Sequence, residues 1–492
     1  DGGRTVLISG CIDTQKVHIS SAIASGYKYM LIVTSDEAKA RKMCDDASFF
    51  NKEAIYYPAK DAIFYSADVH GNQITGERLR CISRIINHSS TGEGVLTVVT
   101  TMDGIADRLI PVERFKEAVI TLDYSSEIDT ERLAKKLVSM GFVRTGMVEN
   151  KGEFAIRGGI IDIFSYTDEA PVRIELWDTE VDSIRMFDVE SQRSIERLQS
   201  YSIFPATEYI FTEDELKNGL YNIKKECDRQ LECFDYGKRK RTKEQIEAGN
   251  NLNKLVADVE RTSNYEKFTD TLVADTVGLA EYFPEENTLV VLDEPNRLKE
   301  CNELTLYEYN ESMKNRLAAG YVLPSQTNKV KAMNEIIGDL RNNKKLILTT
   351  LDYKPEGFEI DYSMYITARS ISSYNNSFEY LAKDLEKYKK NGYTTILVCS
   401  SRTRALRIVD DLGKLGIASF YSEDFNKDYG SGLIIVTYGS LHKGFEYPVL
   451  SFVVIAENDI FSARKMKKLK KKKHDGKNIA SFNELNIGDY VV

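Results

Sequence analysis

The stretch that decides the fold in the middle of the chain reads R-G-G-I-I-D-I-F-S over residues 157–165 and P-V-R-I-E-L-W over residues 171–177. In its second half apolar and polar residues alternate, as they do in a strand whose successive side chains face opposite sides of a sheet. A neighbouring strand over residues 153–157 alternates in the same way. We therefore expect one buried and one exposed face. The predicted buried residues are Phe154, Ile156, Val172, Ile174 and Leu176, and the exposed ones are Arg157, Arg173, Glu175 and Trp177.

Arginine and tryptophan thus share the exposed face. This pairing is a common composition of hot spots in protein-binding surfaces. The alternative is a half-buried Trp177 with arginine stems packed over the sheet, and composition alone favours that structural interpretation. Because Arg157, Arg173 and Trp177 point away from the buried face, we expect alanine at any of them to leave folding nearly intact.

On both sides of this β-rich stretch, short apolar runs alternate with helical segments, which is typical of parallel sheets covered by helices. A helix predicted over residues 130–140 leads into the stretch, and a long helix-periodic segment, 213–264, follows it. Strands resume at 288–292 and 345–350. We therefore expect a discontinuous first α/β domain that holds an inserted domain.

A second α/β unit is predicted to begin near residue 361. The fold class is accordingly α/β and multidomain, with a parallel-sheet domain, an inserted α+β domain, a second α/β domain and a basic linker. The predicted boundaries are 1–122 for the first part of the first domain, 123–205 for the insert, 206–355 for the helical segment and the remainder of the first domain, 356–461 for the second α/β domain, 462–478 for the linker and 479–492 for the start of a further domain.

The composition indicates a protein of several domains. The 492 residues, 42% hydrophobic, suffice for three or so cores. No apolar run has the length of a membrane span or a signal peptide, and we expect no membrane association. Seven cysteines are scattered and never form C-x-x-C, which favours a reducing cytoplasm over a disulfide framework or a zinc site. The five histidines are dispersed, so no metal site is predicted.

The charge is unevenly distributed. The whole chain carries −9, yet residues 464–477 hold nine lysines and arginines against one aspartate, which leaves about −17 for the rest. A run this rich in lysine cannot pack on a core, and lysines contact phosphates without reading sequence. We predict a flexible linker with weak, non-specific DNA affinity. Its basic residues are Arg464, Lys465, Lys467, Lys468, Lys470, Lys471, Lys472, Lys473 and Lys477.

Residues 10–17, G-C-I-D-T-Q-K-V, are a remnant of a phosphate-binding loop. An intact loop reads G-x-x-x-x-G-K-[ST], because its second glycine lets the backbone approach phosphates, its lysine neutralises them and its hydroxyl ligates magnesium. Gly10 and Lys16 are kept, but Gln15 replaces the second glycine and Val17 has no oxygen for the metal. We expect this chain to bind no cofactor.

Two further motor motifs are incomplete. Asp293 and Glu294 follow an apolar strand, as the acid pair of an ATPase does, but the alternative of a surface acid pair is favoured because no competent loop accompanies it. Segment 439–448, G-S-L-H-K-G-F-E-Y-P, is similar to the helicase segment that precedes an arginine-rich nucleotide sensor, yet no Q-x-x-G-R-x-x-R pattern follows it. No catalytic residue is predicted.

The block 157–197 closely resembles the domain shared by UvrB, the bacterial excision-repair helicase, and the transcription-repair coupling factors. In that family the domain docks on UvrA, the damage-recognition ATPase. The resemblance implies that Arg157, Arg173 and Trp177 contact UvrA, although coupling factors usually carry phenylalanine at the position of Trp177. It also implies that the first α/β domain is a degenerate RecA-like, helicase-like domain.

The last residues decide between the two relatives. The closing S-F-N-E-L-N-I-G-D-Y-V-V and the lysine run before it resemble the start of the RNA-polymerase-interacting domain of the coupling factors. The chain has no initiator methionine and ends at Val492 inside an apolar strand pattern. We therefore expect it to be a piece of a longer protein.

The resemblance implies a non-catalytic module that recruits UvrA and precedes a polymerase-binding domain. In the family the full-length protein displaces RNA polymerase stalled at a lesion, so ATP and magnesium are expected only in a motor outside this chain. One alternative is an active UvrB-type, ATP-dependent helicase, which needs glycine at position 15, Ser or Thr at 17 and an aromatic hairpin for which segment 57–77 is too short. A basic-tailed DNA-binding protein is a third interpretation.

Overall fold

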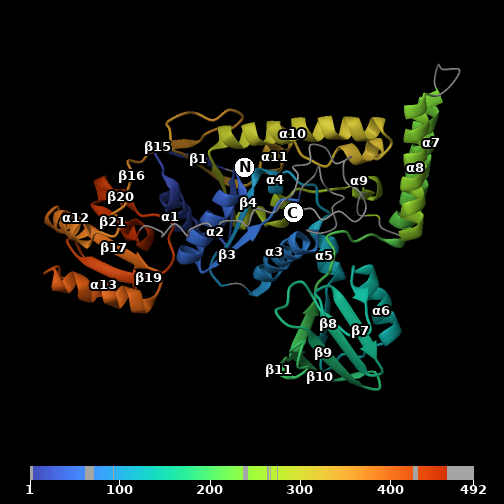
Figure 1. Ribbon diagram of the computed structural model, residues 1–492, viewed down its shortest axis with the longest axis horizontal. Coiled ribbons are helices and arrows are strands. Elements are labelled where there is room, and N and C mark those ends of the chain that lie inside the picture. The colour runs from blue at the N-terminus through green and yellow to red at the C-terminus, as the bar shows by residue number, and fades with distance from the viewer. Residues whose placement is uncertain are drawn as a thin grey trace, which may run out of the picture.

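The computed structural model describes residues 4–60, 71–91, 93–235, 242–262, 265, 268–273, 275–424 and 430–461. It contains two large sheets with helices, an inserted, mostly antiparallel sheet and a two-stranded ladder, so the predicted multidomain α/β class is confirmed (Figure 1). The predicted basic linker and the segment 479–492 lie outside the described residues.

The first domain is built on a seven-stranded, wholly parallel sheet. Its central strands are buried along their whole length, as expected for a parallel sheet covered on both faces. The strand order is β15 (Tyr362–Tyr365), β1 (Thr5–Ser9), β14 (Lys344–Thr349), β13 (Thr288–Asp293), β2 (Tyr29–Thr34), β4 (Leu96–Thr101) and β3 (Glu53–Tyr57).

Helices cover both faces of this sheet. Helices α1 (Asp13–Ala24) and α2 (Glu37–Asn51) pack on one face, and α3 (Gly71–Thr91) and α10 (Pro295–Ala318) pack on the other. The paired helices α7 (Glu213–Asp235) and α8 (Lys243–Thr262) stand at one end of the molecule in Figure 1. The shorter helices are α4 (Met102–Ile105), α5 (Val112–Ala118), α9 (Thr269–Leu272) and α11 (Met333–Asp339).

The domain is discontinuous because β13 and β14, which follow the insert in sequence, lie between β1 and β2 in the sheet. One difference from the sequence analysis concerns β15. That analysis assigns residues 356–461 to the second α/β domain, whereas β15 pairs with β1 in the first sheet. The second sheet begins only at Arg369.

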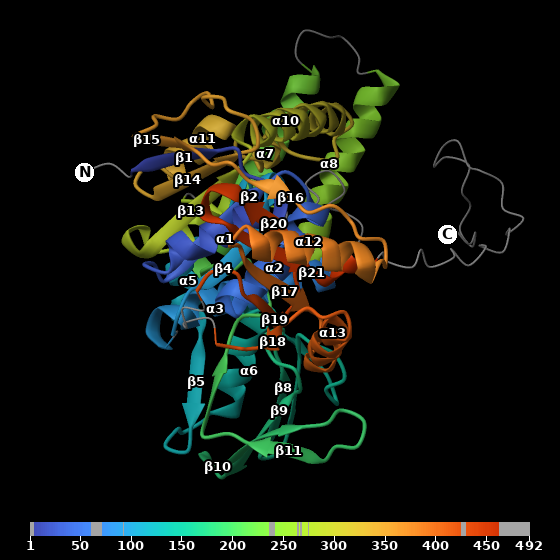
Figure 2. The same ribbon diagram turned by 90° about the vertical axis from the view of Figure 1, so that its left-hand side faces the viewer.

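The inserted domain hangs from the first through an antiparallel ladder of β5 (Ile120–Asp123) and β12 (Ser200–Ile203). Figure 2 shows it beneath the first sheet. Helix α6 (Thr130–Ser139), capped by the Asp129 carboxylate, packs on one face of a six-stranded sheet. That sheet runs β11 (Ser194–Arg197), β10 (Glu180–Phe187), β9 (Val172–Trp177), β8 (Ile160–Phe164), β7 (Glu153–Arg157) and β6 (Val143–Arg144).

The second α/β domain carries a mixed six-stranded sheet with α12 (Phe378–Lys390), α13 (Arg402–Lys414) and α14 (Glu457–Ile460). Its strand order is β16 (Arg369–Ser370), β20 (Phe445–Tyr447), β21 (Phe452–Ala456), β17 (Thr394–Cys399), β19 (Ile434–Tyr438) and β18 (Phe420–Tyr421). Within the described ranges, every helix is too short or too polar to cross a membrane.

Candidate functional site

The exposed face of the inserted sheet carries the three residues predicted from the sequence. Arg173 and Trp177 lie on β9, and Arg157 ends β7. Between the first two positions, Ile174 points into the core and is 0% exposed, as the alternation predicts. Trp177 is 80% exposed. The half-buried tryptophan of the structural alternative is therefore wrong.

The two arginines meet at Asp162, which lies opposite Arg173 in the β8–β9 ladder. Arg173 Nε donates to Asp162 Oδ1 at 2.6 Å, and its Nη2 donates to Oδ2 at 2.9 Å. Arg157 Nη2 donates to the same Oδ2 at 2.6 Å. Trp177 stands four residues farther along β9, about 13 Å at the usual rise of a strand. The structure thus joins the two arginines and places the indole on the same face of the sheet, farther along β9.

Arg173 is held more firmly than the sequence implies. Its side chain is 12% exposed, against 43% for Arg157. It also donates to Gln192 Oε1 at 2.8 Å and lies over the Phe187 ring at 4.3 Å. Removing Arg173 would leave the buried Asp162 short of its main partner, which is a costly change in a protein interior. The contacts therefore predict a larger folding cost for alanine at Arg173 than the alternation alone does.

Sequence reasoning missed Asp162, Gln192 and Phe187 as neighbours of the arginines. A signal for Asp162 exists, because an aspartate in the centre of the apolar run I-I-D-I-F needs a cationic partner when the strand is buried. No such signal marks Gln192 or Phe187, whose contacts depend on the turn after β10.

The remnant of the phosphate loop is closed by an ion-pair cluster. Lys16 Nζ lies 2.7 Å from Asp293 Oδ1 and 2.6 Å from Glu294 Oε1. Asp293 also accepts from Thr34 Oγ1 at 2.6 Å and pairs with Lys39 Nζ at 2.5 Å. Asp293 is 0% exposed, so the interpretation of Asp293 and Glu294 as a surface acid pair is wrong.

The cluster keeps its charges. Burial alone lowers the pKa of Lys16, but the attraction of Asp293 and Glu294 outweighs it and the pKa is raised. Burial alone raises the pKa of Asp293, but Lys16 and Lys39 outweigh it and the pKa is lowered. The lysine that would neutralise a phosphate in an intact loop is therefore already neutralised.

The backbone of residues 10–17 is also engaged by neighbouring groups of the protein. Ile12 N–H, at the start of α1, donates to Gln15 Oε1 at 2.9 Å. Gly10 has a φ of +81° and lies so close to the Ile366 carbonyl oxygen that a Cβ would collide with it. Gln15 and Val17 are both 0% exposed. Side chains and the backbone that follows β15 therefore crowd the position at which an intact loop would approach phosphates.

The second α/β domain is docked on α1 and α2. Asp46 on α2 accepts from Thr14 Oγ1 at 3.0 Å and from the His442 backbone N–H at 2.8 Å. The ring of His18 packs 5.1 Å from that of Phe445 and 5.3 Å from that of Phe50. The helix that follows the phosphate loop thus serves as a domain interface.

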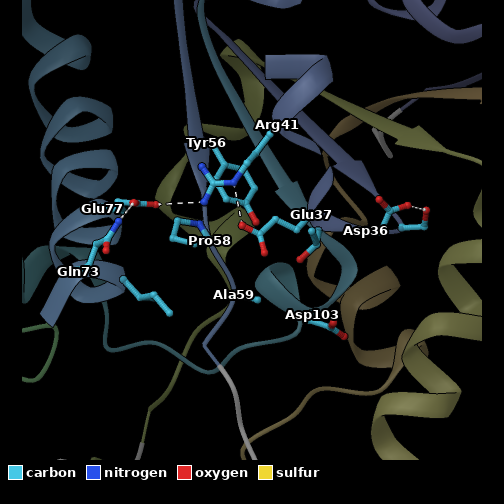
Figure 3. Close-up of a pocket in the computed structure, with 12 residues that line it drawn as sticks. Asp36, Glu37, Arg41, Tyr56, Pro58, Ala59, Gln73, Glu77 and Asp103 are labelled. Carbon is cyan, nitrogen blue, oxygen red and sulfur yellow. Dashed lines mark hydrogen bonds and ion pairs between the residues drawn. The ribbon is translucent and has the colours of Figure 1, made fainter. Parts of the chain in front are cut away.

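A cleft of about 410 Å³ opens where β2, β3 and β4 end (Figure 3). Arg41, the basic residue of its lining, pairs with Glu37 at 2.8 Å, lies 3.6 Å from Glu77 and covers the ring of Tyr56 at 4.5 Å. The cleft is therefore acidic overall and does not suit a phosphate. Among the described residues, no group of three or more His, Cys, Asp or Glu side chains is placed to hold a metal.

The inserted domain and the chain as a whole are both similar to known proteins. Residues 120–209 match the family model described as the UvrB interaction domain. The whole chain is 30% identical to a transcription-repair-coupling factor of Bacillus subtilis and 29% identical to one of Staphylococcus epidermidis, and it covers 41% of each relative. A coupling factor of Staphylococcus aureus is 28% identical over the same share. The chain is thus similar over its full length to about two fifths of a transcription-repair-coupling factor, and its residues 120–209 are similar to the UvrB interaction domain.

Proposed function

We propose that this chain is a non-catalytic module that recruits UvrA during transcription-coupled nucleotide excision repair. The observation that supports the proposal is the exposed face of the inserted sheet, which carries Arg157, Arg173 and Trp177. A tryptophan that is 80% exposed on the same face as two anchored guanidinium groups is the composition of a protein-binding hot spot. We call this surface, made of Arg157, Arg173 and Trp177, the docking face.

The state of the nucleotide-site remnant supports a scaffold role. An ATPase needs a free lysine, a glycine that admits the phosphates and a hydroxyl for magnesium. Here Lys16 is buried against two carboxylates, Gln15 caps α1, and Val17 belongs to the core. The proposed module therefore neither binds nor hydrolyses ATP.

The remaining roles belong to the longer protein. We propose that it displaces stalled RNA polymerase with a motor that uses ATP and magnesium outside this chain. The segment 479–492 would lead into the polymerase-binding domain. The basic run 464–477 would give weak, sequence-independent contact with DNA through its lysines. The module is expected to act in the cytoplasm.

The test is the affinity of the fragment for purified UvrA, measured by titration calorimetry. Trp177→Ala and Arg157→Ala should each weaken the complex by roughly 1–4 kcal/mol, because hot-spot truncations have this size. Tyr307→Ala is the matched control, since Tyr307 is an aromatic residue on α10 that is 67% exposed and far from this sheet in sequence. A wild-type fragment that does not bind UvrA, or equal losses from Tyr307→Ala, would contradict the proposal.

A titration with Mg-ATP tests the scaffold role separately. We expect no saturable binding and no hydrolysis above background. Saturable binding at micromolar nucleotide would instead favour the UvrB-type helicase.

A further inference from the structure

Asp162 occupies an unusual position in the inserted domain. It lies in the middle of β8, is 1% exposed, and is flanked on both sides by apolar core residues. Its two oxygens accept three hydrogen bonds, two from Arg173 and one from Arg157. Charge-assisted bonds of this kind to a buried carboxylate are strong and directional. One carboxylate therefore fixes both guanidinium groups.

We infer that Asp162 is the positioning residue of the docking face. This inference rests on the proposed function, since it concerns how the same surface is prepared for UvrA. Arg157 and Arg173 come from different strands, β7 and β9, with β8 between them. Their guanidinium groups carry like charge and share the Oδ2 atom of Asp162. Without that carboxylate, repulsion would separate the two groups.

The surroundings of Arg173 make the arrangement rigid. Gln192, which accepts from Arg173 Nη2 at 2.8 Å, donates its own Nε2 to the Val189 carbonyl at 2.8 Å. Phe187, beneath the guanidinium, is 1% exposed. A side chain fixed before binding loses less conformational entropy when the complex forms. Asp162 therefore lowers the entropic cost of binding.

The same geometry indicates what the docking face recognises. Arg157, Arg173 and Asp162 together carry a net charge of +1, and Arg157 remains 43% exposed. In the described part of the chain, Arg157 forms no ion pair other than the one with Asp162. Its planar fork suits a carboxylate of the partner. We expect UvrA to present an acidic side chain next to an apolar pocket that takes Trp177.

Asp162→Asn tests the inference in a direct way. The amide keeps the size of the side chain but can no longer accept from both arginines with a full charge. We expect UvrA to bind about ten-fold more weakly, with faster dissociation, while the circular dichroism at the assay temperature shows a folded domain. Glu131→Gln is the matched control, because Glu131 is an exposed carboxylate on α6, which packs on the opposite face of the sheet. It should bind almost as the wild type does.

If Asp162→Asn unfolds the domain, a second pair of variants tests the same inference. Arg173→Met leaves Arg157 paired with Asp162, and Arg173→Met with Asp162→Asn removes both members of the buried ion pair, which proteins tolerate better than the loss of one. The double variant should bind UvrA several-fold more weakly than Arg173→Met, because Arg157 has lost its anchor.

The outcomes separate this inference from the proposed function. If the wild type does not bind UvrA, the proposed function fails. If the wild type binds and Trp177→Ala weakens the complex, but a folded Asp162→Asn variant or the double variant binds as well as its parent, the positioning role of Asp162 is overturned.

Discussion

Lys16 should behave as a structural residue and not as a nucleotide-binding one, and Lys16→Met separates the two roles. The change removes the cation from a cluster in which Asp293 is 0% exposed and Glu294 is 19% exposed at its side chain. Breaking one side of a buried ion pair costs roughly 3–5 kcal/mol. Lys39 and Thr34 still hold the other oxygen of Asp293, so we expect about 3 kcal/mol, the low end of that range.

The assay is thermal unfolding. For a domain of this size, about 3 kcal/mol corresponds to a fall in Tm of roughly 6–12 °C. Lys443→Met is the control, because Lys443 is 62% exposed and lies 3.9 Å from Asp13, which is itself 70% exposed. Such a surface pair is worth less than about 1 kcal/mol. Adding Asp293→Asn to Lys16→Met should recover part of the loss, since the uncompensated buried charge is then gone.

The effect of Lys16→Met should depend on pH with a definite sign. The raised pKa of Lys16 means that its contribution is present below the unfolded pKa, about 10.4, and is lost as pH rises through the folded value. The lowered pKa of Asp293 means that its contribution is present above about 3.9 and is lost as pH falls through the folded value. The difference between wild type and variant should therefore be largest between these limits.

The result that refutes this reasoning is specific. A Lys16→Met protein whose Tm matches that of the wild type, and which loses a nucleotide affinity that the wild type possesses, would show that Lys16 still serves a phosphate site.

Three further predictions concern the docking face, the domain interface and the basic run. Arg173→Ala should destabilise the inserted domain by roughly 2–4 kcal/mol in thermal unfolding, because the buried Asp162 carboxylate then loses its main cationic partner. Arg157→Ala should destabilise the domain clearly less, and equal losses from the two variants would contradict this reasoning. Burial lowers the pKa of His18 to about 4, so a stabilising contribution present above pH ~6.5 should be lost as pH falls towards 4. His18→Phe should abolish that pH dependence, and an unchanged profile would assign it to another group. Deleting residues 464–477 should abolish duplex-DNA binding in a gel-shift assay, and a deleted chain that still holds DNA at physiological salt would require another basic face.

The sequence predicts the inserted sheet well where local periodicity decides the outcome. The alternation in P-V-R-I-E-L-W suffices to bury Ile174 and expose Trp177, because a strand has a period of two. The partner of Arg173, in contrast, cannot be predicted from this alternation. Its contact with Asp162 depends on the register between β8 and β9. The alternation of side chains does not determine this register, because a shift of β9 by two residues keeps the same faces buried and exposed.

The position of β15 shows a second limit of sequence reasoning. Residues 362–365 have a strand composition, and all four are exposed, so no apolar pattern says which sheet they join. Their pairing with β1 is decided by tertiary contacts and not by the local sequence pattern. Sequence reasoning has the same limit at the nucleotide-site remnant. Gln15 and Val17 predict that nucleotide binding is lost, but they do not predict that Lys16 is buried against Asp293 and Glu294.

The ladder between β5 and β12 brings the two ends of the inserted domain together. Ile120 lies opposite Ile203 and Asp123 opposite Ser200, so the chain enters and leaves the domain on adjacent strands about 5 Å apart. A short turn placed across these strands would bridge the gap without shifting the register of the seven-stranded sheet. Residues 120–203 carry most of a core of their own and both strands of the ladder, whereas Glu208, just beyond them, pairs with the buried Arg78 of the first domain. A segment with neighbouring ends can be cut out or replaced by a relative, provided that Glu208 stays behind as the partner of the buried Arg78 and that the space left by Tyr166, which also packs against the core of the first domain, is refilled.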